Sequence, residues 1–116
     1  YIKEGNSDFW MLGWGVPTFD SHYIFNYLLH TNGGSRGSWN PTGFSNADVD
    51  DMIVSLESET DLAARDATIA KIWEIVQAEQ VHLPIHNQVL NWGMKGGINF
   101  DVQPEDQPHF QFLTFN

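Results

Sequence analysis

Apolar residues at helical spacing predict a helix near the middle of the chain. They fall on one face at i, i+3, i+4 and i+7, at Val49, Met52, Ile53 and Leu56. Ser45 with Asp48 forms a capping box at the start of this helix, and Asn46 is the alternative N-cap. Asp50 and Asp51 share the first turn with Asp48, where the helix dipole favours anions. Helix capping therefore accounts for these acids better than a calcium loop does.

One further helix is expected on each side of this segment. Asp20 caps a short helix over about 22–30. A longer helix begins at Thr60 or Asp61 and continues to about Gln80. Its buried stripe consists of Ile69, Ile72, Trp73 and Val76.

Extended segments are predicted toward both ends of the chain. The apolar run 9–14 is typical of a buried strand. Pro84 and the β-branched residues of 81–90 favour a strand over a helix. Alternation across 98–102 predicts a half-buried strand, and the aromatic residues of 110–115 predict a last extended segment. The resulting order of elements indicates a mixed α/β fold without a βαβ repeat.

Composition and charge exclude several classes of protein. The chain has 116 residues, 41% of them hydrophobic and 17% charged, which is typical of one globular domain. Five Lys and Arg stand against fifteen Asp and Glu, giving a net charge of −10, which excludes nucleic acid as a partner and disfavours anionic membrane surfaces. The chain has no cysteine, which excludes disulfides, thiolate zinc sites and cysteine nucleophiles. No apolar run is long enough to span a bilayer.

No motif predicts a metal site, a cofactor site or a catalytic triad. His82 and His86 are four residues apart, but Pro84 between them favours an extended backbone. That backbone separates the two histidines by about 13 Å and prevents a shared zinc ion. The chain has neither G-x-S-x-G nor a Walker phosphate loop. We therefore expect no bound cofactor and no metal.

Aromatic residues beside Gly, Pro or Asn predict a ligand cleft. The four rings in such positions are Trp14, Phe19, Trp39 and Phe44. Rings in irregular segments are less often core than rings on a periodic helical face, so they fit the aromatic walls of a binding cleft. Asp20 lies beside two of them. It can cap a helix, act as a general acid or anchor a ligand, and capping and anchoring can coexist.

Several segments together resemble the family 5 extracellular solute-binding proteins, the dipeptide, oligopeptide and nickel receptors of ABC importers. They are GWGVPTFD at 13–20, NPTGFSNADVD at 40–50, ETDLAAR at 59–65, the run from Trp73 through Pro84, and PHF at 108–110. They cover nearly the whole chain in the order of the family. Two positions depart from its pattern. Pro17 stands where peptide receptors commonly carry an Asp that pairs with the ligand's α-amino group, and Ala47 replaces a proline.

The resemblance implies that residues 1–116 are the C-terminal portion of such a receptor. They would form part of the second lobe of a type II periplasmic-binding-protein fold, with a mixed sheet flanked by helices. The start at Tyr1, which is neither an initiator Met nor part of a signal peptide, agrees with a piece of a longer protein. The implied function is capture of a small solute without covalent chemistry. A peptide is favoured, and nickel chelates, sugars and opines stay open.

The resemblance also implies a set of ligand-binding residues and a location. The residues are Trp14, Gly15, Val16, Phe19, Asp20 and Asn40. The two rings are apolar walls, the Gly and the Val offer backbone groups, the Asp anchors a cationic group, and the Asn supplies a hydrogen bond. The partners are the ligand and an ABC permease. The location is periplasmic or extracellular, with or without a membrane tether.

Two other classes of protein stay open. A glycoside hydrolase piece would use Asp20 as an acid or base together with a second carboxylate. A protein-interaction module would use the exposed aromatic loops. The isolated chain is also expected to dimerise or aggregate, because a lobe cut through its sheet exposes strand edges and apolar surface.

Overall fold

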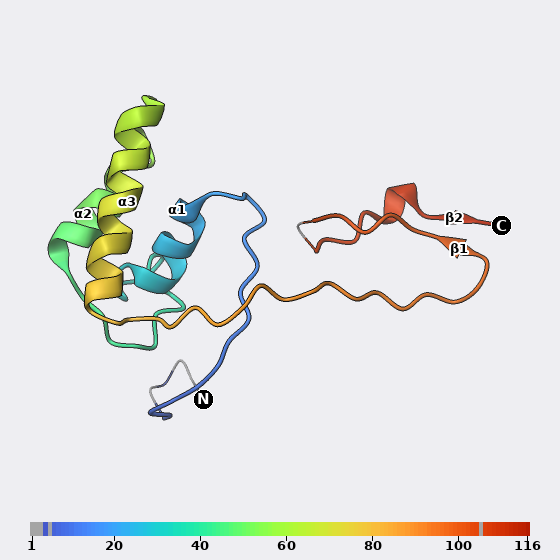
Figure 1. Cartoon of the computed structure of the whole chain (residues 1–116), viewed down its shortest axis with the longest axis horizontal. Helices are drawn as coiled ribbons and strands as arrows, with labels where there is room; N and C mark the ends of the chain where they lie inside the picture. The colour runs from blue at the N-terminus through green and yellow to red at the C-terminus, as the bar shows by residue number, and fades with distance from the viewer. Residues whose placement is uncertain (1–3, 5, 105) are drawn as a thin grey trace.

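The helices within residues 21–78 gather at one end of the molecule, and a two-stranded ribbon with one short helical turn lies at the other (Figure 1). The computed structural model describes residue 4 and residues 6–104 and 106–116, and the start of the chain at 1–3 lies outside them. The elements are α1 (Ser21–Ile24), the π-helical turn η2 (Phe25–Leu29), α2 (Ala47–Ser55), α3 (Leu62–Ala78), β1 (Ile98–Asn99), the 3₁₀ turn η3 (Phe110–Phe112) and β2 (Thr114–Phe115). The chain therefore contains both helix and strand, as its sequence predicts.

Side-chain caps fix where the two longer helices begin. Asn46 caps α2, and its side-chain Oδ1 accepts the Val49 N–H at 3.2 Å. The choice between Ser45 and Asn46 is thus settled in favour of Asn46. Asp61 caps α3 by accepting the Ala64 N–H at 2.8 Å, which settles the choice between Thr60 and Asp61 for the start of this helix.

The C-terminal end of α3 is closed by a Schellman arrangement. Gln80 takes a left-handed conformation with φ 52°, and its N–H donates to the Gln77 carbonyl at 3.1 Å. The Val81 N–H donates to the Val76 carbonyl at 3.2 Å, and the Val81 side chain packs against the core. These two bonds satisfy carbonyls that the helix end leaves free, and they turn the chain out of the helix.

The apolar core lies among η2, α2 and α3. Its buried residues are Phe25, Leu29, Val49, Ile53, Leu56, Ile72 and Val76. Met52, Ile69 and Trp73 are partly buried against them. The apolar stripes predicted for the two longer helices are therefore confirmed. Trp73 packs edge-on against Phe25, with ring centroids 5.0 Å apart.

The predicted buried strand at 9–14 is wrong. These residues form no strand, and the Phe9 and Met11 side chains are 89% and 73% exposed. The strand predicted at 81–90 does not form either. A strand needs a neighbour, and among the described residues no ladder of backbone hydrogen bonds joins either segment to another.

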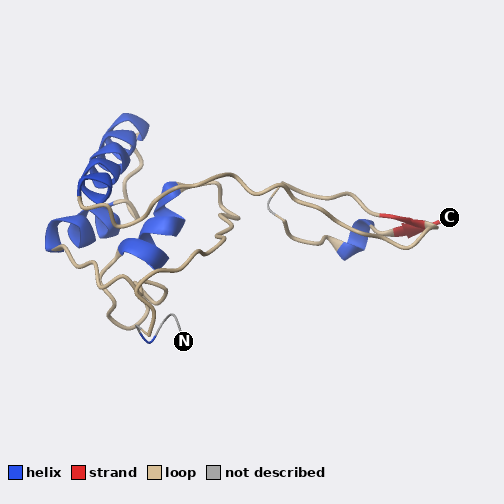
Figure 2. Cartoon of the chain, turned by 60° about the horizontal axis from the view of Figure 1, so that its bottom comes forward, coloured by secondary structure: helices blue, strands red, loops and turns tan. Residues whose placement is uncertain are grey.

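The ribbon is shorter than its sequence pattern predicts. β1 and β2 pair antiparallel, with Ile98 opposite Phe115 and Asn99 opposite Thr114. The strand expected at 98–102 thus shortens to two residues, and the segment expected at 110–115 begins as a helical turn. Figure 2 shows the ribbon standing apart from the helices. The described residues therefore do not form the expected mixed sheet flanked by helices.

The chain exposes more surface than a compact domain of its size. Its radius of gyration is 17.7 Å, against about 13 Å for a compact chain of this length. Its accessible surface is 8455 Å², against about 6,400 Å² for a folded monomer of this mass. The segment after α3 causes much of this difference, because it runs away from the helices toward the ribbon (Figure 1).

Truncation of a core residue on α2 tests this packing. Ile53→Ala is expected to lower the free energy of unfolding by about 2–4 kcal/mol, because Ile53 is fully buried and its loss leaves a cavity. Val54→Ala is the matched control on the neighbouring position, where the side chain is 41% exposed, and it should cost below about 1 kcal/mol. Urea unfolding followed by tryptophan fluorescence measures both. Equal losses in the two variants would contradict the described core.

Candidate ligand-binding site

Four aromatic side chains from separate parts of the sequence meet beside α1. This aromatic cluster consists of Trp14, Tyr23, Tyr27 and Trp39. The Trp14 ring centroid lies 5.8 Å from that of Trp39, and 6.3 and 6.4 Å from those of Tyr23 and Tyr27. Two of the four rings predicted to line a cleft, Trp14 and Trp39, are therefore brought together.

Local backbone structure explains how the rings of the cluster converge. Tyr23 and Tyr27 are four residues apart on α1 and η2, so their rings share a helical face. The two ring centroids are 4.9 Å apart. Gly37 has a positive φ of 62°, and a Cβ there would collide with the His30 carbonyl oxygen. This close approach turns the loop back, and the Trp39 N–H then donates to the Tyr27 carbonyl at 3.0 Å.

Trp14 borders an open hollow and carries a buried polar atom without a partner. The hollow has a volume of about 350 Å³. It is lined by Trp14, Gly15, Pro17, Tyr23, Asp106 and Gln107. The Trp14 Nε1–H is buried and has no acceptor among the described residues. Most buried polar groups are hydrogen-bonded, so an indole N–H in this state calls for an acceptor from outside the described residues.

The turn after Trp14 presents backbone rather than side chains. A Cβ at Gly15 would meet nothing within 4 Å, so its backbone is accessible to a ligand. The Val16 carbonyl accepts the Phe19 N–H at 3.0 Å, which closes the turn and engages that oxygen. Phe19 has a φ of 53° and a side chain that is 71% exposed, and it does not join the aromatic cluster. Gly15 thus offers the freer backbone groups of the two predicted positions.

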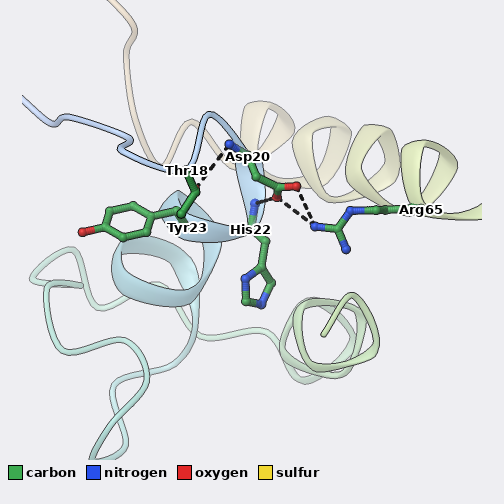
Figure 3. A pocket seen from close by; sticks show the side chains of 5 residues that line it. All are labelled: Thr18, Asp20, His22, Tyr23 and Arg65. Atoms are coloured by element: carbon green, nitrogen blue, oxygen red, sulfur yellow. Dashed lines mark hydrogen bonds and ion pairs between the residues drawn. The ribbon is translucent and has the colours of Figure 1, made fainter. Parts of the chain in front are cut away.

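Asp20 is engaged within the chain on two sides (Figure 3). Its Oδ1 accepts the His22 N–H at 2.8 Å, so it caps α1 as predicted. Both carboxylate oxygens also accept from Arg65 Nη2 of α3, each at 2.8 Å. A second hollow of about 230 Å³ surrounds this pair and is lined also by Thr18 and Tyr23.

The contacts of Asp20 keep its carboxyl ionised. Partial burial pushes the pKa of Asp20 up, but the hydrogen bonds from Arg65 and from the His22 N–H outweigh burial and leave the pKa below its ordinary value of 3.8. Arg65 also donates to the Leu56 carbonyl at the end of α2. The sequence placed Arg65 on the long helix but gave no sign of this pairing across 45 residues.

Asn40 is buried, and its side chain organises the loop before α2. Its Nδ2 donates to the His30 carbonyl at 3.0 Å and to the Phe44 carbonyl at 2.9 Å. Its Oδ1 accepts the Thr42 hydroxyl at 2.7 Å. Both amide hydrogens are therefore used inside the chain, so the Asn40 side chain has no free donor for a ligand. Phe44, the remaining predicted cleft ring, packs against the core instead.

Asp106 and Gln107 are site residues that sequence reasoning missed. They lie about ninety positions after Trp14, between the two segments predicted to be extended, where the sequence pattern predicted no element. Asp106 accepts the Trp92 Nε1–H at 3.0 Å, which leaves its second oxygen outside that bond. No local signal marks such a pairing, because it depends on how the chain beyond α3 folds back.

Metal ligands do not gather among the residues that the structure describes. No group of three or more His, Asp or Glu side chains there could hold an ion. Burial lowers the pKa of His82, while His86 lies exposed. In the described part of the chain, no helix has both the length and the apolar character needed to cross a membrane. Comparison with known protein families, curated proteins and solved structures gives no match.

The Asp20–Arg65 pair makes stability depend on pH. Because the pKa of Asp20 is lowered in the folded chain, its stabilising effect is complete above 3.8 and is lost as the pH falls through the folded value. Asp20→Asn should cost about 1 kcal/mol at neutral pH and should flatten the loss of stability between about pH 5 and about pH 3. Urea midpoints across this range measure both effects.

The exposed Asp51 provides the control for this experiment, because Asp51→Asn changes the same charge on α2. Some acid dependence will persist in Asp20→Asn, since the hydrogen bond from Arg36 lowers the pKa of Glu57 as well. An identical acid profile for Asp20→Asn and the unaltered chain would show that the pair does not stabilise the fold.

Proposed function

We propose that the chain is the C-terminal portion of a solute-binding protein of an ABC importer, and that it captures a small peptide. The observation that carries the proposal is Trp14. Its ring belongs to the aromatic cluster, it borders the 350 Å³ hollow, and its buried indole N–H lacks an acceptor. A hydrogen-bond acceptor on a ligand, such as a peptide carbonyl, satisfies such a donor.

The other walls of the hollow fit a peptide. Tyr23 gives an apolar face, the exposed backbone of Gly15 gives hydrogen-bonding groups, and the Gln107 amide gives both a donor and an acceptor. Asp106 supplies the carboxylate for a cationic amine. Asp20 is a positioning residue in this proposal, because Arg65 already neutralises it.

The open shape of the hollow agrees with one wall of a two-lobed cleft. In the proposed fold the chain is part of the second lobe of a type II periplasmic-binding protein, and a facing lobe closes over the ligand through a hinge. The protein acts without covalent chemistry or a cofactor. It works in the periplasm or outside the cell, and it delivers its ligand to a membrane permease.

The contacts of Asp20 weaken the hydrolase alternative. A general acid needs a raised pKa, and the pKa of Asp20 is lowered by Arg65 and the His22 N–H. The interaction-module alternative has an observation in its favour, namely the long apolar segment after α3.

Thermal unfolding with a ligand panel tests the proposal. A single wall binds weakly, so each of a tripeptide mixture, a nickel–histidine chelate and an oligosaccharide is supplied at about ten times a millimolar Kd. The binding ligand should then add about 1.4 kcal/mol to stability. This corresponds to a Tm rise of roughly 5–10 °C. The peptides are expected to give the rise.

Trp14→Ala and Phe9→Ala form a matched pair for this experiment. Trp14→Ala removes the ring of the proposed site and should abolish the Tm rise with peptides. Phe9→Ala removes a ring that is 89% exposed and should leave the rise unchanged. No rise with any of the three ligands, or an equal rise in both variants, would rule out binding at Trp14.

A further inference from the structure

Asn32 is the one asparagine of the sequence that is followed by a glycine. It begins the glycine-rich loop, residues 32–38, which lies between η2 and α2. Asn32 and the two glycines after it are exposed. Among the described residues, the Asn32 side chain takes part in no hydrogen bond. The carbon of its side-chain amide is therefore open to attack by a neighbouring group.

The backbone nitrogen of Gly33 is the neighbouring group that can make this attack. Glycine has no side chain that shields its nitrogen or limits its backbone angles. The Gly33 N–H donates to the Arg36 carbonyl across a tight turn, and the two atoms are 3.3 Å apart. This bond is longer than the usual separation of about 2.9 Å, so it holds the nitrogen weakly. The loop thus leaves the nucleophile beside the Asn32 amide.

We propose that Asn32 is a site of spontaneous deamidation, a reaction that makes asparagine a thermolabile residue. The Gly33 nitrogen forms a bond to Cγ of Asn32, the Cγ–Nδ2 bond breaks, and ammonia leaves with the proton of the Gly33 N–H. Water then opens the resulting five-membered ring at one of its two carbonyls, which gives isoaspartate or aspartate. The net reaction exchanges an amide for a carboxyl group and consumes water alone.

Asn87 is the internal comparison for Asn32. Its side chain is exposed as well, and it has no hydrogen bond within the described part of the chain. The residue after it is Gln88, whose side chain shields the backbone nitrogen and restricts its approach. Asn40 differs in another way, because it precedes Pro41, which has no N–H. The residue that follows therefore singles out Asn32 as the reactive position.

The position of Asn32 gives the reaction a structural consequence. The Thr31 N–H before it donates to Asp50 Oδ1 at 2.9 Å, and the Arg36 side chain after it pairs with a carboxylate beyond α2. Isoaspartate routes the main chain through Cγ and so lengthens the backbone between these two contacts. Either product also adds a carboxylate beside the residue that Asp50 already binds. Both changes loosen the loop that carries Trp39 into the aromatic cluster, whether or not the cluster binds a ligand.

Peptide mapping by mass spectrometry tests the reaction on the folded chain, kept in mildly alkaline buffer and sampled over days. Asn32 should gain the mass of the amide-to-carboxyl exchange, as two isomers that chromatography separates, while Asn87 stays unchanged. Gly33→Ala should suppress the conversion, because its methyl group shields the attacking nitrogen. A Cβ at Gly33 would approach the Thr31 carbonyl oxygen to 3.9 Å, an ordinary contact, so the variant fits the loop.

Gln88→Gly is the matched gain-of-reaction variant. It places a glycine after the exposed Asn87 and should make that residue deamidate as well, which shows that the buffer permits the reaction. An Asn32 that stays intact under these conditions would overturn the proposal. Equal conversion of Asn32 in Gly33→Ala and in the unaltered chain would overturn it too.

Urea unfolding of aged samples tests the structural consequence. The urea midpoint of the unaltered chain should fall as the converted fraction rises, because the lengthened loop packs less well. Gly33→Ala, aged in parallel, should keep its midpoint, and its helical circular dichroism signal should match that of the fresh unaltered chain. A midpoint that stays constant in the converted, unaltered chain would show that deamidation leaves the loop packing intact and would contradict this consequence.

Discussion

The arrangement of the candidate site depends on the Asp20 carboxylate. This one group caps α1 and also binds Arg65 of α3, so it joins the start of the first helix to the longest one. The turn that carries Trp14 leads directly into Asp20, and its backbone has a single internal hydrogen bond, from the Phe19 N–H to Val16. A partly exposed ion pair contributes modestly to stability. The pair also holds the start of α1, which carries Tyr23 of the aromatic cluster, against α3.

Apolar side chains are buried in one region of the chain and exposed in another. Around Ile53 and Ile72 the helices bury their stripes, and this burial stabilises the helical end. Beyond Val81 many large apolar side chains are exposed, among them Leu83, Ile85 and Val89. Apolar surface in this amount requires a partner. The first region supports the candidate site, and the second leaves an extended apolar segment exposed.

The helices could be predicted from sequence because their determinants are local. The side chains of Asn46 and Asp61 each accept the backbone N–H three residues further along the chain. The apolar stripe that contains Val49 and Ile53 repeats within two helical turns. Strand pairing is not local, so the apolar run 9–14 predicted a strand that finds no neighbour in the described chain.

The candidate site shows the same difference between local contacts, which the sequence predicts, and long-range contacts, which it does not. The cap at Asp20 was predictable, but its pairing with Arg65 across 45 residues was not. Asn40 carries the polar side chain expected of a ligand contact, yet its amide bonds the loop around it. Sequence type identifies residues that can make a hydrogen bond, and only the fold decides which partner they meet.

Titration of the ¹⁵N-labelled chain with trialanine, followed by ¹H–¹⁵N correlation spectra, tests the proposed peptide site most directly. The indole N–H of Trp14 reports on its missing acceptor, and that of Trp39 reports on the rest of the aromatic cluster. Both signals should shift progressively with peptide, while the indole signal of Trp73, which packs in the core, should stay in place. Unchanged Trp14 and Trp39 signals at saturating trialanine would contradict peptide capture by this chain.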